Sequence, residues 1–209
     1  MRIGIIGSGN IGATAAQLFA RAGHDVAISN SRGPETLQEL VDNIGPNVRA
    51  VTLEEAAEFG EVVLEAIPFG RYKELPVEPL AGKVVVDTAN YYPQRDGEID
   101  LGGLTSSEEI ARYLGPDVRL VKALNTMYYE TLASEGNPEA SLEERLVLFV
   151  AGDDEEAKAV VSRLIEEIGF APVDTGSLGE GGSKQQPGSA VYNEPMTPSQ
   201  AREALAGTT

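Results

Sequence analysis

The N-terminal stretch constrains the fold of this chain more than any other part of the sequence. The run Arg2-Ile3-Gly4-Ile5-Ile6 leads into Gly7-Ser8-Gly9-Asn10-Ile11-Gly12, after which apolar residues recur at helical spacing. A buried strand that passes through G-x-G-x-x-G directly into a helix is typical of a dinucleotide-binding unit. Gly7 then permits the tight turn, Gly9 lets the backbone approach a pyrophosphate, and Gly12 lets the helix pack on its strand. We expect the whole segment to contact the cofactor at the helix N-terminus.

Strand-like and helix-like segments alternate along the chain as far as residue 175. This alternation predicts a Rossmann-like, doubly wound α/β fold, with a mostly parallel sheet and helices on both faces. After that point the composition changes to Gly, Ser, Gln and Pro. We therefore predict a nucleotide-binding Rossmann domain over 1–175 and a Gly/Pro-rich C-terminal tail over 176–209. The tail ends in a short helix capped by Thr197.

The loop after the second predicted strand indicates which dinucleotide binds. This strand, 24–29, ends in Asn30-Ser31-Arg32. An acidic residue about twenty positions past the fingerprint would hold the ribose hydroxyls of NAD, whereas an arginine there accommodates the 2′-phosphate of NADP. A serine hydroxyl beside a planar guanidinium suits that phosphate. We therefore predict NADP(H) rather than NAD(H) as the cofactor of the 1–175 domain.

Three other strand ends supply candidate cofactor contacts. In open α/β sheets, ligands bind outside the carboxyl ends of the strands, where the strand order reverses. The segment Ala66-Ile67-Pro68 ends the fourth predicted strand and should lie near the nicotinamide. Asn90, Ala123 and Asn125 end the next two strands and are further candidates, although Asn also favours turns for local reasons.

Composition excludes several classes of function. The chain has 33 acidic and 16 basic residues, a formal net charge of −17, which disfavours a nucleic-acid partner or an anionic membrane. It has no cysteine, which excludes thiol catalysis and thiolate metal sites, and we expect no metal. Without a long apolar run or a secretory leader, we expect a cytoplasmic protein that acts on a small molecule.

No side chain stands out as a proton donor. His24 begins the second predicted strand, on the far edge from the cofactor, and Lys122 lies within a strand. Tyrosines near the crevice suit stacking better than acid catalysis, although both roles remain open: they are Tyr91, Tyr92, Tyr128 and Tyr129. We therefore predict hydride transfer by positioning, with no catalytic side chain and with Pro68, Asn125 and Met127 beside the reacting rings.

Four segments together resemble the family of coenzyme F420-dependent NADP oxidoreductases. They are Gly7 to Gly12, Asn30-Ser31-Arg32, Ala66-Ile67-Pro68 and Lys122-Ala123-Leu124-Asn125-Thr126. The resemblance covers about residues 1–175, and membrane ferric reductases share this nucleotide domain. It implies that Ser31 and Arg32 contact the 2′-phosphate. It also implies hydride transfer between NADPH and C5 of a deazaflavin, coenzyme F420, in a cytoplasmic homodimer.

The leading hypothesis is therefore an NADPH-dependent oxidoreductase that passes a hydride to a deazaflavin-type ring. Two alternatives stay open from the residues alone. One is an NADPH-dependent reductase of a flavin, a quinone or a small carbonyl, with a tyrosine as proton donor. The other is a non-catalytic NADP(H)-sensing module whose tail responds to binding.

Overall fold

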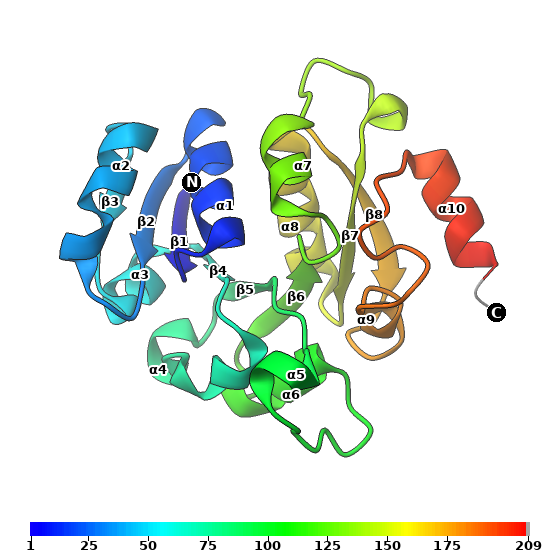
Figure 1. The fold of residues 1–209 in the computed structure, drawn as a ribbon, viewed down its shortest axis with the longest axis horizontal. Helices are drawn as coiled ribbons and strands as arrows, with labels where there is room; N and C mark the ends of the chain where they lie inside the picture. The colour runs from blue at the N-terminus through cyan, green and yellow to red at the C-terminus, as the bar shows by residue number, and fades with distance from the viewer. Residues whose placement is uncertain (208–209) are drawn as a thin grey trace.

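A computed structural model describes residues 1–207 of the chain. Within them the strands are β1 (Arg2–Ile6), β2 (Asp25–Ser29), β3 (Val48–Ala50), β4 (Val62–Glu65), β5 (Val84–Asp87), β6 (Arg119–Ala123), β7 (Val147–Gly152) and β8 (Ala171–Gly176). They form one sheet in the order β3-β2-β1-β4-β5-β6-β7-β8 (Figure 1). All neighbouring strands run parallel except β6 and β7, which are antiparallel. The predicted doubly wound, mostly parallel sheet is confirmed.

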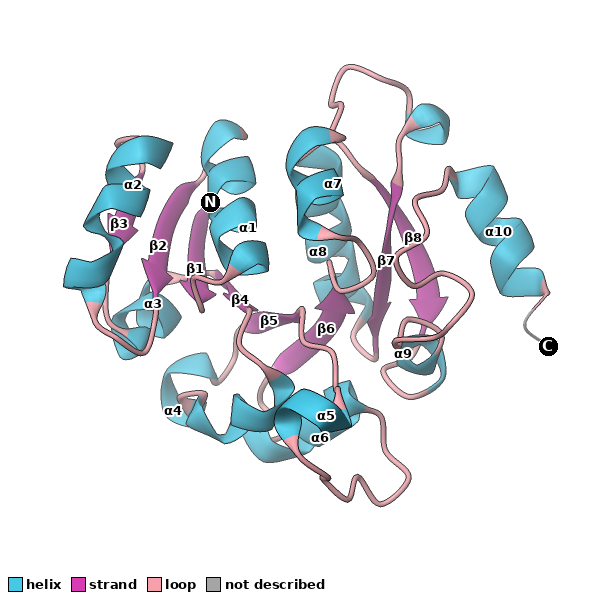
Figure 2. Cartoon of the chain, in the orientation of Figure 1, coloured by secondary structure: helices cyan, strands magenta, loops and turns pink. Residues whose placement is uncertain are grey.

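Helices cover both faces of this sheet (Figure 2). The α-helices are α1 (Asn10–Arg21), α2 (Gln38–Ile44), α3 (Leu53–Phe59), α4 (Val77–Leu80), α5 (Pro93–Asp96), α6 (Ser106–Leu114), α7 (Tyr129–Ser134), α8 (Glu155–Glu167), α9 (Glu180–Ser183) and α10 (Pro198–Ala206). Short 3-10 helices are η1 (Pro34–Leu37), η2 (Phe69–Glu74) and η3 (Leu142–Glu144). No helix among the described residues combines the length and apolar character needed to cross a bilayer.

Alternation along the strands sends successive side chains into different layers. In β4, Val62 and Leu64 join the apolar layer beneath α1, α2, α7 and α8, whereas Val63 joins the layer beneath α3, α4, α6 and η2. The strands β5 and β6 follow the same pattern. Charged side chains at the ends of these strands therefore enter the second layer, at the carboxyl edge of the sheet.

Short local signals begin several helices where the sequence indicates. Capping boxes form between Thr52 and Glu55 at α3 and between Thr105 and Glu108 at α6. Residues 34–44 form η1 and then α2, because the first turn of this segment is a 3-10 helix, as is frequent at helix N-termini. The last strand, β8, lies at the edge of the sheet, where its proline, Pro172, is tolerated.

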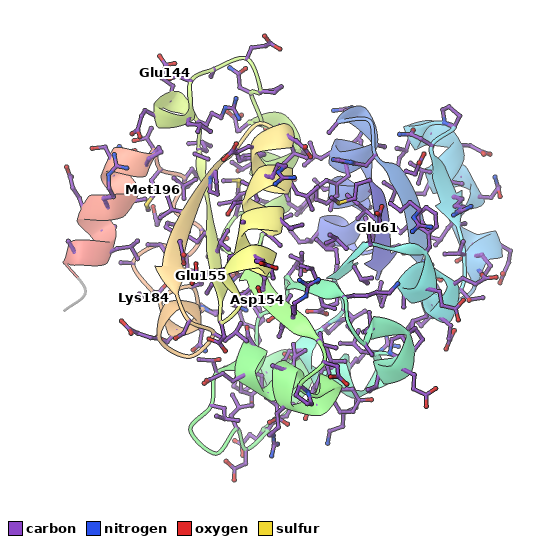
Figure 3. The ribbon with its side chains drawn as sticks, turned by 180° about the vertical axis from the view of Figure 1, so that it is seen from behind. Glu61, Glu144, Asp154, Glu155, Lys184 and Met196 are labelled. Atoms are coloured by element: carbon purple, nitrogen blue, oxygen red, sulfur yellow. The ribbon has the colours of Figure 1, made fainter. Side chains whose placement is uncertain are left out.

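The segment 176–207 packs against the sheet instead of standing apart from it. Val191, Met196 and Ala201 form a buried apolar cluster with Phe149 of β7 and Ala171 of β8; Met196 is labelled in Figure 3. This cluster places α10 over the face of β7 and β8 that α8 leaves open, at the opposite end of the molecule from α2 (Figure 1). The predicted terminal helix is α10, with the capping box that begins at Thr197.

Candidate functional site

The strand order reverses between β1 and its two neighbours, and the fingerprint turn lies at that point. β1 pairs with β2 on one side and with β4 on the other. Gly7 has φ of 109°, and a Cβ there would lie 2.4 Å from the carbonyl oxygen of Ala66. A Cβ on Gly12 would lie 1.9 Å from the carbonyl oxygen of Gly7, so the helix packs on the turn because Gly12 has no side chain. Above Gly9 a Cβ would meet no atom within 4 Å, which leaves room for a ligand.

The N-terminus of α1 faces this open space, and within residues 1–207 no side chain caps it. The helix is 12 residues long, and its N-cap, Gly9, offers no side chain to accept a hydrogen bond. Its first turn holds no acidic residue. The free N–H groups and the positive end of the helix dipole therefore suit an anion.

One cavity of about 260 Å³ opens beside the fingerprint, and we call it the fingerprint cavity. Its lining residues are Ile6, Gly7, Ser8, Gly9, Asn30, Ser31, Arg32, Leu53, Ala66, Ile67, Pro68, Arg71 and Glu74. Asn30 ties the β2 loop to the fingerprint, because its Nδ2 donates to Ser8 Oγ at 3.3 Å and its Oδ1 accepts from the Arg32 amide at 2.9 Å. The fingerprint and the loop predicted to read the 2′-phosphate thus share one cavity.

A second cavity of about 410 Å³ lies on the other side of the β4 loop, and we call it the tyrosine cavity. It shares Gly9, Ala66, Ile67 and Pro68 with the fingerprint cavity. Its other lining residues are Asn10, Ile11, Thr88, Ala89, Asn90, Tyr92, Arg95, Leu124, Asn125, Met127, Tyr128, Tyr129, Tyr192 and Asn193. The shared wall makes the two cavities neighbouring parts of one cleft.

The C-terminal segment forms one wall of the tyrosine cavity. The hydroxyls of Tyr92 and Tyr192 form a short hydrogen bond, and Asn90 Nδ2 lies 3.4 Å from the Tyr192 hydroxyl. The amide of Asn193 donates to the Thr126 carbonyl at 2.8 Å. Burial, and then the hydrogen bond to Tyr92, raise the pKa of Tyr192. Its hydroxyl therefore stays protonated and can donate a hydrogen bond, but it is a weaker acid than an ordinary tyrosine.

Backbone strain gathers at the same cavity. Among residues 1–207, the non-glycine residues with positive φ are Leu124, at 61°, and Asn193, at 56°. Both line the tyrosine cavity. Residues other than glycine rarely adopt this conformation, although Asn does so more readily than most, and such strained residues cluster at functional sites. The strain therefore favours this cavity as a candidate binding site.

Three ionisable side chains lie buried side by side near the carboxyl edge of the sheet. Glu65 of β4 is in register with Asp87 of β5, which is in register with Lys122 of β6. Lys122 Nζ lies 3.4 Å from Asp87 Oδ2 and donates to the Ala89 carbonyl at 2.9 Å. Ser107 Oγ donates to Asp87 at 2.5 Å. This row fixes the start of the loop that carries Asn90 into the tyrosine cavity.

Glu65 is the neutral member of this row. Burial, and then the negative charge of Asp87, raise the pKa of Glu65 well above its ordinary value. Burial also acts to raise the pKa of Asp87, but the Lys122 ammonium and hydrogen bonds outweigh it and leave that pKa lowered. Glu65 Oε1 has no hydrogen-bond partner within residues 1–207.

Glu65→Gln should be at least as stable as the wild-type protein at neutral pH. Because the folded pKa lies above the unfolded value, the folded state keeps a proton that the unfolded chain releases. The free energy of unfolding therefore falls as the pH rises from the unfolded pKa through the folded pKa. Glutamine does not titrate, so Glu65→Gln should remove this fall of the free energy of unfolding with pH. Urea unfolding between about pH 5 and 8 measures the change. Glu61→Gln, at an exposed position just before the same strand (Figure 3), is the matched control, and an unchanged slope in Glu65→Gln would contradict the assignment.

Most residues predicted from the sequence line one of the two cavities, including the nearby candidates Pro68, Asn125 and Met127. Gly12 lies behind the turn, as its packing role requires. Ala123 does not fit its predicted role, because its side chain is 0% exposed in the core and Leu124 lines the cavity in its place. The alternation of β6 accounts for this, since it turns Ala123 beneath the helices.

The structure also shows which candidate proton donors lie at the cleft and which do not. His24 is buried against the Phe19 ring at the start of β2, with Nε2 2.9 Å from a Glu167 carboxylate oxygen. Lys122 lies in the buried row and lines neither cavity. Tyr91 is outside as well, because its hydroxyl donates to the Gly97 carbonyl. The tyrosines that line the cavity are Tyr92, Tyr128, Tyr129 and Tyr192.

Sequence reasoning missed several lining residues. Arg71 and Glu74 of η2 line the fingerprint cavity beside Leu53, and Arg95 lines the tyrosine cavity, where its guanidinium lies 5.0 Å from the centre of the Tyr92 ring. Arg71 lies three residues after Pro68, so its nearness to the predicted crevice was a usable signal. Thr88 has no distinguishing sequence signal.

Comparison with known proteins agrees with this geometry. Residues 2–91 match the family described as NADP oxidoreductase, coenzyme F420-dependent. The hypothetical protein SMa0349 of Sinorhizobium meliloti is 34% identical, with a TM-score of 0.82 over 94% of this chain and 95% of that one. A candidate F420-dependent NADP reductase from Arthrobacter sp. FB24 is 28% identical, with a TM-score of 0.70 over 85% of this chain and 86% of that one.

A curated relative extends beyond this chain. The metalloreductase STEAP3 of Rattus norvegicus is 31% identical over 183 residues, which are 85% of this chain but 34% of that protein. The chain thus spans about a third of the length of the curated relatives that it matches. The fingerprint, the sheet order and these similarities agree, and the chain belongs to the family of coenzyme F420-dependent NADP oxidoreductases.

Proposed function

We propose that the protein transfers a hydride between NADP(H) and a deazaflavin ring of the coenzyme F420 type. The observation that carries the proposal is the shared wall of the two cavities, formed by Gly9 and the segment Ala66-Ile67-Pro68. A nucleotide bound along the fingerprint cavity would present its nicotinamide at this wall. A second planar ring in the tyrosine cavity would then face it.

The residues present fit NADP(H). The open space above Gly9 and the free amides of α1 suit a pyrophosphate. Ser31 and Arg32 line the cavity at the β2 end, and the Arg32 guanidinium forms no ion pair within residues 1–207. It is therefore available to a 2′-phosphate. When bound, the nicotinamide supplies or accepts the hydride, and the chain holds and orients it.

The tyrosine cavity fits an extended ring better than a small carbonyl. Aromatic rings and Met127 offer flat apolar surfaces, and the amides of Asn90 and Asn125 offer hydrogen bonds to a polar ring edge. Reduction of a deazaflavin takes one hydride from NADPH and one proton, which solvent can supply. The raised pKa of Tyr192 favours hydrogen bonding over proton donation.

The direct test is to mix the protein, NADPH and oxidised coenzyme F420 and follow the visible absorbance of the deazaflavin. We expect the absorbance to bleach as NADPH is consumed. Intact NADPH binding without bleaching at any pH would reject the deazaflavin as acceptor. Tight binding without oxidation by any acceptor tried, with altered proteolysis of 176–209, would instead support a sensing module.

A second candidate is the reduction of a flavin, quinone or small carbonyl, favoured by the hydroxyl pair of Tyr92 and Tyr192 in the cavity. For a carbonyl, one tyrosine would donate the proton, so Tyr92→Phe or Tyr192→Phe should abolish turnover. A ring-to-ring hydride transferase should keep its turnover in both variants. Tyr91→Phe is the matched control, since Tyr91 lies outside the cavity.

Arg32→Ala should weaken NADPH binding by about 1.5–3 kcal/mol, the size of a lost charge-assisted contact, and leave NADH binding nearly unchanged. Calorimetric titration with both nucleotides measures the difference. Arg202→Ala is the matched control, because Arg202 is exposed on α10 and pairs with Glu143 far from the cleft. Equal losses for the two nucleotides would mean that Arg32 does not read the phosphate.

The homodimer and the cytoplasmic location, both implied by the family resemblance, stay predictions. Light scattering of the purified chain at several concentrations tests the first. A mass of one chain at every concentration would contradict it.

A further inference from the structure

We propose that Arg71 is a second guanidinium that selects the 2′-phosphate of NADP(H), and that Glu74 holds Arg71 until the phosphate displaces the Glu74 carboxylate. This inference rests on the proposed NADP(H) function. It adds a specificity residue that neither the fingerprint nor the β2 loop contains. The two side chains line the fingerprint cavity together with Ser31 and Arg32.

The 3-10 helix η2 fixes where Arg71 lies. Phe69 is 0% exposed and Tyr72 is 4% exposed, and their rings stack with centroids 5.2 Å apart. The Tyr72 hydroxyl donates to Glu109 at 2.6 Å, and the Arg71 amide donates to the Pro68 carbonyl at 2.8 Å. With one side of η2 anchored in this way, Arg71 and Glu74 are left at the cavity. The helix follows Pro68 directly, so the anchor is part of the switch-point loop.

Arg71 and Glu74 already form the bidentate geometry that a phosphate would use. Arg71 Nε lies 2.8 Å from Glu74 Oε1, and Nη2 lies 2.5 Å from Oε2. A phosphate offers the same pair of acceptor oxygens, with a charge of about −1.5 to −2 at neutral pH. The side chains of Arg71 and Glu74 are 43% and 50% exposed. Because an exposed ion pair contributes little free energy, exchanging one anion for a more strongly charged one is favourable.

The charge of the cavity supports this exchange. Arg32, Arg71 and Glu74 together carry a formal charge of +1. This is less than the positive charge that would neutralise a phosphate dianion. The whole chain carries −17, so a polyanionic nucleotide depends on local cations. Turning Glu74 away would leave two guanidinium groups for one phosphate. NADH, which lacks the phosphate, would leave the pair of Arg71 and Glu74 intact.

The test compares 2′,5′-ADP with 5′-AMP, two fragments that differ by the 2′-phosphate. Arg71→Ala should weaken the binding of 2′,5′-ADP by about 10-fold or more, as for a lost charge-assisted contact. It should change the affinity for 5′-AMP by less than about twofold. Arg71→Lys keeps the charge but loses the planar guanidinium, so its affinity for 2′,5′-ADP should lie between those of the wild-type protein and Arg71→Ala. Glu74→Gln should raise the affinity for 2′,5′-ADP by about two- to fivefold, the effect expected of removing one exposed charge.

Matched controls come from an ion pair at the other end of the molecule. Arg202 Nη2 lies 3.0 Å from Glu143 Oε2, with side chains 61% and 67% exposed. Arg202→Ala and Glu143→Gln make the same changes in net charge and should leave both fragments unaffected. An Arg71→Ala effect no larger than that of Arg202→Ala would overturn the inference. Weaker 2′,5′-ADP binding in Glu74→Gln would overturn the proposed displacement of Glu74 by the phosphate, because Glu74 would then hold Arg71 in place for the bound ligand.

Failure of this inference can be distinguished from failure of the proposed function. If the wild-type protein binds 2′,5′-ADP no better than 5′-AMP, the predicted choice of NADP(H) is itself wrong. If the wild-type preference is present and Arg32→Ala removes it while Arg71→Ala does not, only the role of Arg71 is rejected. Thermal unfolding of each variant shows whether a loss of binding reflects a loss of folded protein.

Discussion

Lys122→Met should lower the free energy of unfolding by about 3–5 kcal/mol, the cost of leaving a buried charge without its partner. Lys122 and Asp87 are 1% and 0% exposed, and methionine would retain most of the apolar stem of the lysine. Asp87 would keep its hydrogen bonds from Ser107 and from the Ala89 amide, but no cation. For a domain of this size the melting temperature should fall by roughly 10 °C. Urea and thermal unfolding measure both quantities.

Lys158→Met is the matched control for this prediction. Lys158 is also buried, but its partners Asp174 and Glu155 are 50% and 82% exposed and stay hydrated after the change. We expect a loss of about 1 kcal/mol or less there. Combining Lys122→Met with Asp87→Asn should recover much of the loss, because the uncompensated charge is gone. Equal losses in the two single variants would show that the buried row does not depend on its charge balance.

The consequence for the cleft follows from where Lys122 donates its other hydrogen bond. The Ala89 carbonyl that it holds precedes Asn90, whose amide reaches the Asn125 carbonyl and the Tyr192 hydroxyl. Residues of the tyrosine cavity are thus supported by a buried ion pair that touches no ligand. Lysine within a strand gave no sequence signal of this role, because alternation alone does not reveal its partner.

Features made by neighbouring residues could be read from the sequence. The spacing of Gly7, Gly9 and Gly12 predicts a turn, an open approach and a close helix contact, and each glycine has the predicted surroundings. The loop with Ser31 and Arg32 reaches the same cavity because β2 follows α1 directly and pairs with β1. Local chemistry and one connection were enough for this half of the cleft.

Features that depend on contacts between residues far apart in the chain could not be predicted from the sequence. Tyr192 meets Tyr92 across 100 residues, after the antiparallel β7 has reversed the direction of the chain. The composition of 176–209 is typical of a loop, and its described part is ordered by a small apolar cluster and by the fully buried Gln185. Arg71 is a different case, since η2 is too short to show a hydrophobic period and only the burial of Phe69 and Tyr72 orients it.

Gly9→Ala and Gly12→Ala should separate cofactor binding from stability. A methyl on Gly9 would meet no protein atom within 4 Å, and its φ of −69° suits any residue. The free energy of unfolding should therefore change by less than about 0.5 kcal/mol. The same methyl would occupy the approach to the pyrophosphate, so NADPH binding should weaken by about 3 kcal/mol, or roughly a hundredfold, as two charge-assisted contacts are lost.

Gly12→Ala should behave in the opposite way. Alanine gains about 1 kcal/mol of helix propensity over glycine. However, its Cβ would lie 1.9 Å from the Gly7 carbonyl oxygen, which is backbone and cannot rotate away. Moving α1 off the turn should cost about 2–3 kcal/mol net, measured by urea unfolding without nucleotide. A stable Gly12→Ala variant, or an unstable Gly9→Ala variant, would contradict the division of roles, because the added methyl meets the protein at Gly12 and the space reserved for the phosphates at Gly9.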